Sequence, residues 1–184
     1  MNFTACQRGI EMKEGHLDIN QFLFPREKAF TDLHLLFCER NLRTILDVGG
    51  PSRAFNIFNI QNWIYRYSNI TGSQKSHFIQ DDICNSKIES DSFDLVCSND
   101  MFEHILEPWL AAEHCVRICK SGGLLFHITL FYWDLHNSPI DCYRYSHIGL
   151  THLFERTGKV KTINCGYYQH KKSKQRVIYF GEKI

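Results

Sequence analysis

The chain has 184 residues, a formal net charge of +1 and 43% hydrophobic residues, a composition that fits one globular domain with a single core. Only 22% of the residues are charged, so the chain lacks the large basic surface of a general nucleic-acid binder. No segment has the roughly 18 consecutive apolar residues of a membrane span, and residues 1–13 lack the apolar stretch of a secretory signal. The sequence therefore predicts a cytoplasmic protein with no membrane partner.

The eight cysteines form no Cys-x-x-Cys pair, so the spacing typical of zinc sites is absent. Cys115 and Cys119 are four residues apart in an expected helix and can share its buried face as small hydrophobic residues. We expect every cysteine to be a reduced thiol, as is usual in the cytosol.

Apolar residues at helical spacing predict three helices, and shorter apolar runs predict strands between them. The helices are expected over 26–41, 107–120 and 149–157, with a short one over 54–60. The strands are expected over 44–48, 63–67, 77–80, 92–97, 124–128, 160–165 and 176–180. This alternation predicts an α/β fold, a Rossmann-like, mostly parallel sheet with helices on both faces and a C-terminal antiparallel strand pair.

Two of the expected helices have a clear apolar face. The first should bury Phe30, Leu33 and Phe37 after a start at Pro25. The second should end at Ser121-Gly122-Gly123. Its buried face is expected to comprise Trp109, Ala112, Val116 and Cys119.

The stretch Ile45-Leu46-Asp47-Val48-Gly49-Gly50-Pro51 joins an apolar strand to an acid and two glycines. Because glycine has no Cβ, Gly49 and Gly50 allow a ligand to approach the backbone closely. Asp47 supplies an acceptor at the carboxyl end of the strand. A strand that ends in Gly-Gly-Pro is also a common tight turn, so this motif alone leaves both interpretations open.

Polar residues follow three further strands in the same way. The carboxyl ends of parallel strands share one edge of the sheet, and ligands bind beyond that edge. We therefore expect a single rim made of residues 47–51, 81–83, 98–100 and 129–133.

Four motifs, in order, resemble those of the class I S-adenosylmethionine-dependent methyltransferases, type 11. Residues 45–50 resemble the first motif, and residues 78–83 resemble the segment of the third strand. Residues 91–105 are similar to the Ser-Phe-Asp-Leu-Val strand with its Leu-Glu-His-type helix start, and residues 120–125 to the Lys-Pro-Gly-Gly segment. The resemblance covers residues 43–158, including a segment over 136–146 that is similar to the His-Pro-x-Asp-Tyr-Trp-Arg-Tyr-Thr segment of one branch.

The resemblance implies an enzyme that transfers the methyl group of S-adenosyl-L-methionine to an oxygen or nitrogen of a small-molecule acceptor by in-line displacement. It implies a single domain, with an N-terminal helical or lid segment (1–42), a cofactor-binding core (43–158) and a closing strand pair (159–184). By the same match, Asp82 meets the adenine amino group and Ile83 covers the adenine ring. The full set of implied cofactor-binding residues is Asp47, Gly49, Gly50, Pro51, Asp81, Asp82, Ile83, Asn99 and Asp100.

Methyl transfer to oxygen or nitrogen needs at most one base, and histidine titrates near neutral pH without a large shift in its pKa. His104 and His136 are the candidate catalytic residues.

Segment 131–145 has the density of aromatic residues that is typical of a pocket wall or lid. Arg144 suits a carboxylate or phosphate on a substrate. The alternative is that Arg144 bonds Asp141 or Glu155 while the tyrosines pack on the sheet. The candidate substrate-binding residues are Tyr132, Trp133, Tyr143 and Arg144.

The chain departs from the family pattern at two points. Pro51 and Arg53 stand where the first motif has its second and third glycines. Residues 65–69 offer no carboxylate for the ribose hydroxyls, a loss of about 1.5 to 3 kcal/mol of binding that Asn69 or Ser68 offsets only in part.

Two alternatives stay open. The departures also fit a methyltransferase fold that no longer catalyses and serves as a binding or scaffold subunit. Asp100, Glu103 and His104 resemble the metal-binding start of the small-RNA 2'-O-methyltransferases, with His136 or His147 as the last ligand of a magnesium or manganese ion.

The same acid and histidine pattern occurs widely in type 11 enzymes without metal, and the near-neutral charge disfavours RNA. We therefore expect a small-molecule substrate, no metal ligands and no nucleic-acid partner, and make no prediction of oligomeric state.

Overall fold

The computed structural model describes residues 18–58, 63–72, 75–137, 140–171 and 174–184. Residues 1–17 of the expected N-terminal segment, which include Cys6, and the end of the expected short helix at 59–60 lie outside these ranges. Each of the seven cysteines within them is a free thiol, as expected.

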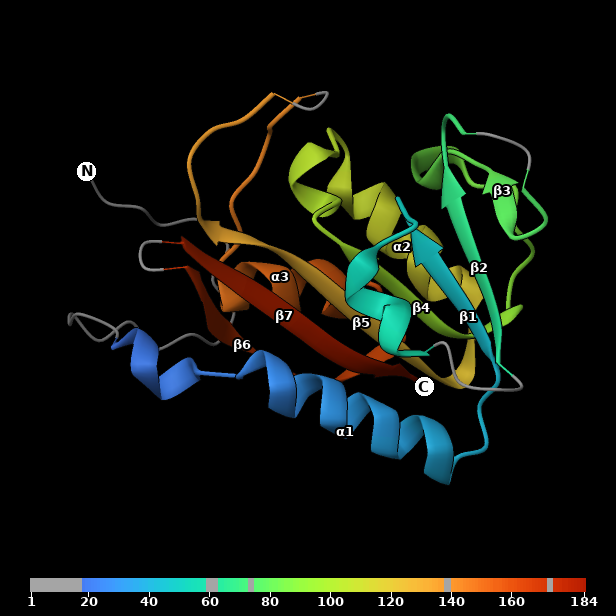
Figure 1. Cartoon of the computed structure of the whole chain (residues 1–184), viewed down its shortest axis with the longest axis horizontal. Helices are drawn as coiled ribbons and strands as arrows, with labels where there is room; N and C mark the ends of the chain where they lie inside the picture. The colour runs from blue at the N-terminus through green and yellow to red at the C-terminus, as the bar shows by residue number, and fades with distance from the viewer. Residues whose placement is uncertain (1–17, 59–62, 73–74, 138–139, 172–173) are drawn as a thin grey trace.

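The described chain forms one seven-stranded sheet in the order β3-β2-β1-β4-β5-β7-β6 (Figure 1). The first five strands pair in parallel, and β7 pairs antiparallel with both β5 and β6. The predicted α/β class with a closing antiparallel pair is confirmed. The strands are β1 (Thr44–Val48), β2 (Ile64–Asn69), β3 (Phe78–Gln80), β4 (Phe93–Asn99), β5 (Cys119–Tyr132), β6 (Val160–Lys171) and β7 (Lys174–Lys183).

Helices cover both faces of the sheet, α1 on one side and α2 with α3 on the other (Figure 1). Their bounds are α1 (Arg26–Glu39), α2 (Pro108–Ile118) and α3 (His147–Glu155), with 3-10 helices η1 (Ile19–Phe22), η2 (Arg53–Phe58), η3 (Ile83–Asn85) and η4 (Phe102–His104). The sheet divides the core into two clusters, and successive residues of β1 enter different ones: Leu46 packs with α2, and Ile45 packs with α1. Burial on both faces explains why β1 is apolar without alternation. Among the described residues, no helix is both long and apolar enough to cross a membrane.

Helix α1 follows the prediction closely. It begins directly after Pro25, whose fixed φ suits a helix start, and buries Phe30, Leu33 and Phe37. In α2, Ala112 and Val116 are buried as expected.

Two expectations for α2 were wrong. Trp109 is 41% exposed rather than buried. The helix ends at Ile118, because Cys119 has extended backbone angles and pairs with Phe93 as the first residue of β5. Ser121-Gly122-Gly123 therefore lies within β5 rather than at the helix end, with Gly122 at φ +73°.

Asp94 ties the amino ends of β1 and β4 together. One of its carboxylate oxygens accepts hydrogen bonds from the Thr44 hydroxyl (2.7 Å) and from the backbone N–H groups of Thr44 (2.8 Å) and Arg43 (3.0 Å). The other accepts from Lys120 Nζ (2.9 Å). Partial burial acts to raise the pKa of Asp94, but these donors outweigh it and hold the pKa at about 2.

We predict that Asp94→Asn lowers the free energy of unfolding by about 1–2 kcal/mol at pH 7. The pKa of Asp94 in the folded state lies below its ordinary value of 3.8, so its contribution is fully present above pH 4 and is lost as the pH falls toward 2. Urea unfolding between pH 3 and 7 should show the difference from wild type shrinking toward low pH. Asp32→Asn, at a surface pair with Lys28, is the control and should change stability by less than about 0.5 kcal/mol. A pH-independent difference for Asp94→Asn would contradict this account.

Candidate functional site

The carboxyl ends of the parallel strands meet at one edge of the sheet. β1 lies between β2 and β4, with Asp47 beside Tyr67 on one side and Cys97 on the other. Three of the expected polar sets, at residues 47–51, 81–83 and 98–100, follow the ends of β1, β3 and β4. The fourth lies partly within β5, which continues to Tyr132.

Asp47 is fully buried at the end of β1. Its Oδ2 accepts from the Tyr65 hydroxyl (2.6 Å) and from the Ser52 backbone N–H (2.7 Å), while its Oδ1 is buried with no hydrogen-bond partner. Burial raises the pKa of Asp47 to about 6, although both hydrogen bonds act to lower it. The loop after Gly50 therefore folds back onto Asp47 and leaves one carboxylate oxygen free to accept.

The two glycines of the turn are needed for space. A Cβ at Gly50 would lie 2.5 Å from Asp47 Oδ2, and a Cβ at Gly49 would lie 2.9 Å from Met101 Cγ. Gly49 also has a φ of +78°, a backbone angle that residues with a side chain rarely adopt. The Gly50–Pro51 peptide bond is cis.

Asn69 stands at the end of β2, where the resemblance seen in the sequence implies a carboxylate. Its Nδ2 lies 3.5 Å from the Gly49 carbonyl oxygen, and its Oδ1 accepts from the Ile70 N–H (2.8 Å). Asn69, the weaker neutral replacement expected from the sequence, is therefore already bonded to neighbouring backbone groups.

The acids after β3 have different partners. Asp81 Oδ1 accepts from the Lys87 N–H (2.9 Å), and its Oδ2 is buried without a partner. Asp82 caps η3 by accepting from the Cys84 N–H (3.0 Å), and Ile83 beside it is buried. A second buried acceptor oxygen therefore lies on this rim.

At the end of β4, Asn99 donates to Asp100 (3.0 Å), and Asp100 accepts two hydrogen bonds from Arg176 of β7 (2.7 and 2.8 Å). The Arg176 guanidinium also lies over the ring of Trp133, 4.5 Å from its centroid. Asp100 is thus neutralised by a bidentate pair.

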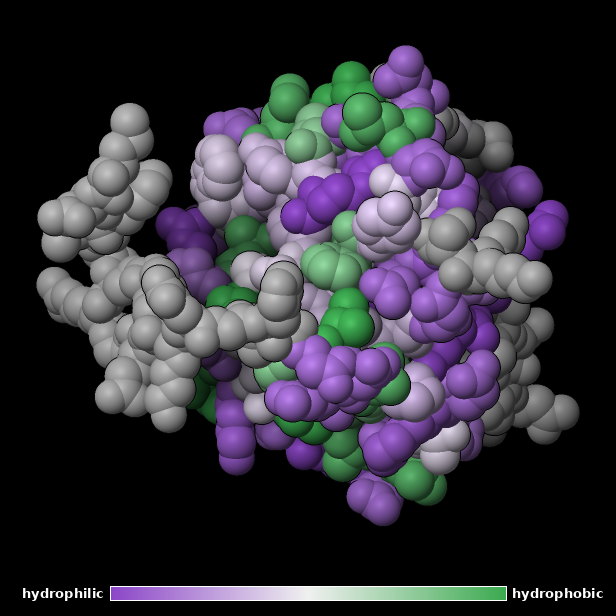
Figure 2. Space-filling model, turned by 90° about the vertical axis from the view of Figure 1, so that its left-hand side faces the viewer, coloured by the Kyte–Doolittle hydropathy of each residue, from purple (hydrophilic) through white to green (hydrophobic). Residues whose placement is uncertain are grey.

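Beside Asn99 a cleft of about 660 Å³ opens between the start of α1, the start of η2 and the β6–β7 hairpin. Its wall is rich in arginine and aromatic residues and includes Arg26, Arg53, Tyr167, Tyr168, His170 and Arg176. Figure 2 views the side of the molecule that carries the hairpin and the end of β5, where hydrophilic and hydrophobic side chains are intermixed.

The expected substrate-binding residues do not line this cleft. Tyr132 is 63% exposed at the end of β5, and the Tyr143 hydroxyl donates to the Leu106 carbonyl (3.1 Å). Trp133 does not line the cleft itself, but it contacts two residues of the cleft wall, Arg176 and His170.

All five N–H donors of Arg144 have acceptors within its own loop. They bond both carboxylate oxygens of Asp141 and the carbonyl oxygens of Trp133, Asp134 and Tyr143. The alternative pairing of Arg144 with Asp141 is the one observed. A substrate could reach this guanidinium only by displacing one of these bonds.

His104 and His136 lie together, with ring centroids 5.1 Å apart. Glu103 is buried beside them, its Oε1 3.9 Å from His104 Nε2. The structure thus brings the two candidate catalytic residues into one cluster, to which it adds a buried acid.

Sequence reasoning missed Arg176, which lines the cleft, and it named Asp141 only as a partner of Arg144 and not as the acid beside His136. An arginine at the head of the apolar run Val-Ile-Tyr-Phe and an acid three residues before an arginine were the available signals.

The family model Methyltransf_11, described as a methyltransferase domain, matches residues 61–127. No curated protein sequence was found to match the chain.

Solved structures match over most of the chain at low sequence identity. Burkholderia thailandensis 1,6-didemethyltoxoflavin-N1-methyltransferase, with bound 1,6-didemethyltoxoflavin and S-adenosylhomocysteine, is 12% identical with a TM-score of 0.66, over 84% of this chain and 77% of that chain. Magnesium protoporphyrin IX methyltransferase from Synechocystis PCC 6803, with bound S-adenosylmethionine, is 13% identical with a TM-score of 0.60, over 86% and 79%. A chain from the complex of the Haloferax volcanii Trm112 methyltransferase activator is 17% identical with a TM-score of 0.61, over 86% and 92%.

The fold is that of the class I methyltransferases. Within this class, the matching family model is the type 11 methyltransferase domain, so the resemblance seen in the sequence motifs is confirmed.

We predict that Arg144→Lys lowers the free energy of unfolding by about 1–3 kcal/mol, because one ammonium group cannot replace a five-donor fork. Urea unfolding measures the effect. Arg156→Lys is the matched control, since its pair with Glu113 is exposed and should contribute less than about 0.5 kcal/mol. Equal effects for the two variants would show that the Arg144 network adds no stability.

Proposed function

We propose that the protein transfers the methyl group of S-adenosyl-L-methionine to an oxygen or nitrogen of a small-molecule acceptor. The observation that carries this proposal is the rim of buried acceptors at the carboxyl edge of the sheet, with a cleft of about 660 Å³ directly beside it. In support, the chain carries a methyltransferase-domain match, and similar structures hold this cofactor or its demethylated product.

The residues present suit the cofactor. Asp47 Oδ1 and Asp81 Oδ2 are buried acceptors without donors, which is costly unless a ligand supplies them. S-adenosylmethionine carries an ammonium group, two ribose hydroxyls and an adenine amino group. Gly50 leaves no side chain against Asp47, and Gly49 leaves none against Met101.

When bound, the cofactor supplies an electrophilic methyl group. The chain then has to hold the acceptor in line with that group, a contribution that can reach roughly 7 to 11 kcal/mol. We assign the methionine end to Asp47 and the glycine turn with Pro51, and the adenine end to Asp81, Asp82 and Ile83. Asn99 and Asp100 complete the cofactor set.

The cleft favours a small acceptor that carries an acidic group. A volume of this size is typical of small-molecule sites. The charge of Arg176 is neutralised by Asp100. Of the other charged residues in the cleft wall, Arg26 and Arg53 are positive and Glu27 is negative, so the wall has a net positive charge. Trp133 supports the wall through Arg176. His104 and His136, whose ring centroids lie 5.1 Å apart, are the candidate bases.

We predict that wild type binds S-adenosylmethionine in calorimetry and that Gly49→Val weakens binding by about 2.7 kcal/mol or more, a hundredfold. The new side chain would displace Met101 and strain the turn. Gly158→Val is the matched control, because Gly158 has a similar φ of +67° but open space around it.

Equal affinities of the two variants would mean that the turn does not hold the cofactor. Absence of any binding by wild type at millimolar cofactor would overturn the methyl-transfer proposal and favour the binding or scaffold alternative.

We predict that cofactor affinity rises about tenfold between pH 5 and pH 7. Asp47 has a pKa of about 6, so at pH 5 it is mostly protonated and its neutral form attracts the cofactor ammonium less. The neighbouring titratable groups, Tyr65 and Cys97, both have a pKa raised by burial and stay neutral in this range. Calorimetry should give a flat pH profile for Asp47→Asn. The same slope in both proteins would assign the effect to another group.

A further inference from the structure

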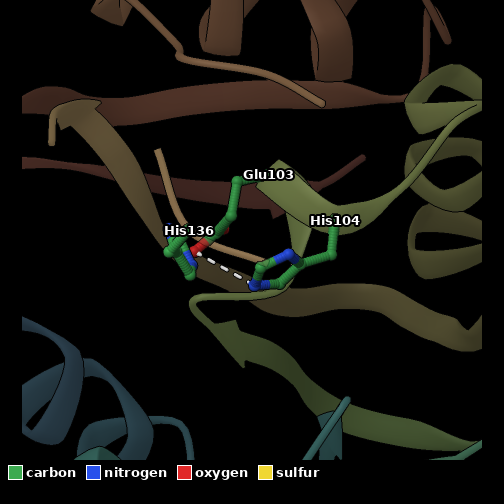
Figure 3. A group of neighbouring side chains, drawn as sticks. All are labelled: Glu103, His104 and His136. Carbon is green, nitrogen blue, oxygen red and sulfur yellow. Dashed lines mark ion pairs between the residues drawn. The ribbon is translucent and has the colours of Figure 1, made fainter. Parts of the chain in front are cut away.

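Three side chains from two segments that are distant in the sequence converge after the end of β4. Glu103 and His104 belong to η4, and His136 comes from the loop after β5, on the opposite side of the cluster (Figure 3). One ligand atom from each lies within 4.8 Å of the other two. We propose that Glu103, His104 and His136 bind a divalent first-row transition-metal ion.

The buried carboxylate of Glu103 lacks a partner that a cation would supply. Glu103 is fully buried, and its Oε2 accepts from the Thr129 hydroxyl at 2.7 Å. Its Oε1 is buried with no hydrogen-bond partner, and it is the oxygen that points toward His104 (Figure 3). An unpaired buried carboxylate oxygen is costly, and a metal ion is one of the few partners that offsets this.

Both histidines are oriented as metal ligands. The Nδ1 of His104 contacts the Ile140 carbonyl oxygen, which can only accept, so Nδ1 carries the proton. The Nδ1 of His136 lies 3.2 Å from Asp141 Oδ2, and Asp141 is held ionised by Arg144. Each imidazole therefore keeps its Nε2 lone pair for a metal, an arrangement of outer partners that is typical of histidine ligands.

The separations suit one ion after a small closure. Bonds of about 2.0–2.2 Å put the ligand atoms of a single ion about 3–3.5 Å apart. His104 Nε2 and Glu103 Oε1 are already 3.9 Å apart.

The ligand types select the ion. Two imidazoles and one carboxylate suit zinc, iron, cobalt or manganese better than calcium or magnesium, which prefer oxygen ligands. Three protein ligands leave further coordination positions open, and the histidine side chains are 18% and 36% exposed, so water or a ligand oxygen can enter.

The fourth ligand of the pattern in small-RNA 2'-O-methyltransferases is not assembled. Asp100 is held by Arg176, and His147 is bonded to Tyr167 and stacked on Phe22. This proposal thus departs from our expectation of no metal and from the four-ligand alternative, and with the ion bound neither histidine is free to act as the base.

The test uses the full-length chain, freed of any purification tag and stripped with a chelator. Co²⁺ is the probe, followed by equilibrium dialysis and by its visible absorption, with Zn²⁺ and Mn²⁺ as competitors. We expect one ion per chain, and at least tenfold weaker binding for His136→Ala, His104→Ala and Glu103→Gln. His152→Ala, at an exposed histidine of α3, is the matched control and should bind as wild type does.

His136→Ala is the decisive variant, because its side chain is partly exposed and its loss should leave the thermal midpoint of the metal-free chain unchanged. Absence of stoichiometric binding, equal affinity of His136→Ala and His152→Ala, or a thiolate charge-transfer band would each overturn the proposal. Calorimetry of the same metal-free protein with S-adenosylmethionine tests the proposed function separately. Cofactor binding without metal binding would overturn only the metal site, and metal binding without cofactor binding would overturn only the proposed function.

Discussion

The site depends on the parallel pairing of β1 between β2 and β4. These three strands are parallel, so their carboxyl ends lie at the same edge of the sheet. Asp47, Asn69 and Asn99 are therefore brought to that edge. The register is fixed at the opposite end, where Asp94 binds the backbone of β1 and the side chain of Lys120. A polar interaction at the amino ends of the strands thus sets the position of the residues at their carboxyl ends.

A second constraint acts on the loop after β5. Asp141 joins His136 to Arg144, and Arg144 in turn binds three carbonyl oxygens of the loop. The backbone carbonyl of Glu103 accepts from the N–H groups of Cys142 and Tyr143. These bonds hold the loop against η4. His136 therefore lies beside Glu103, although 32 residues lie between them in the sequence. The described part of this loop is therefore held by polar contacts as well as by the packing of Tyr143 and Tyr145 against the core.

The apolar pattern was sufficient to predict β1, β4 and α1, because each buries a continuous set of side chains. It failed at Trp109 and Gly122, where the outcome depends on neighbours outside the segment. Cys119 pairs with Phe93 and extends β5 backward through two glycines that look like a helix end in the sequence. The partners of Arg144 and Arg176 could not be read from spacing, because an arginine finds its acceptors only after loops and hairpins have assembled.

Arg176 connects the cleft to the Glu103 cluster. It lines the cleft, lies over Trp133 and neutralises Asp100, whose negative charge would otherwise oppose ionisation of Glu103. If Asp100 were unpaired, it would compete with Glu103 for any cation at this edge of the sheet. With Asp100 held by Arg176, Glu103 is left as the unpartnered acid between the two histidines. An anionic acceptor in the cleft would draw on the same guanidinium, so occupancy of the cleft and the charge balance of the cluster are coupled through one side chain.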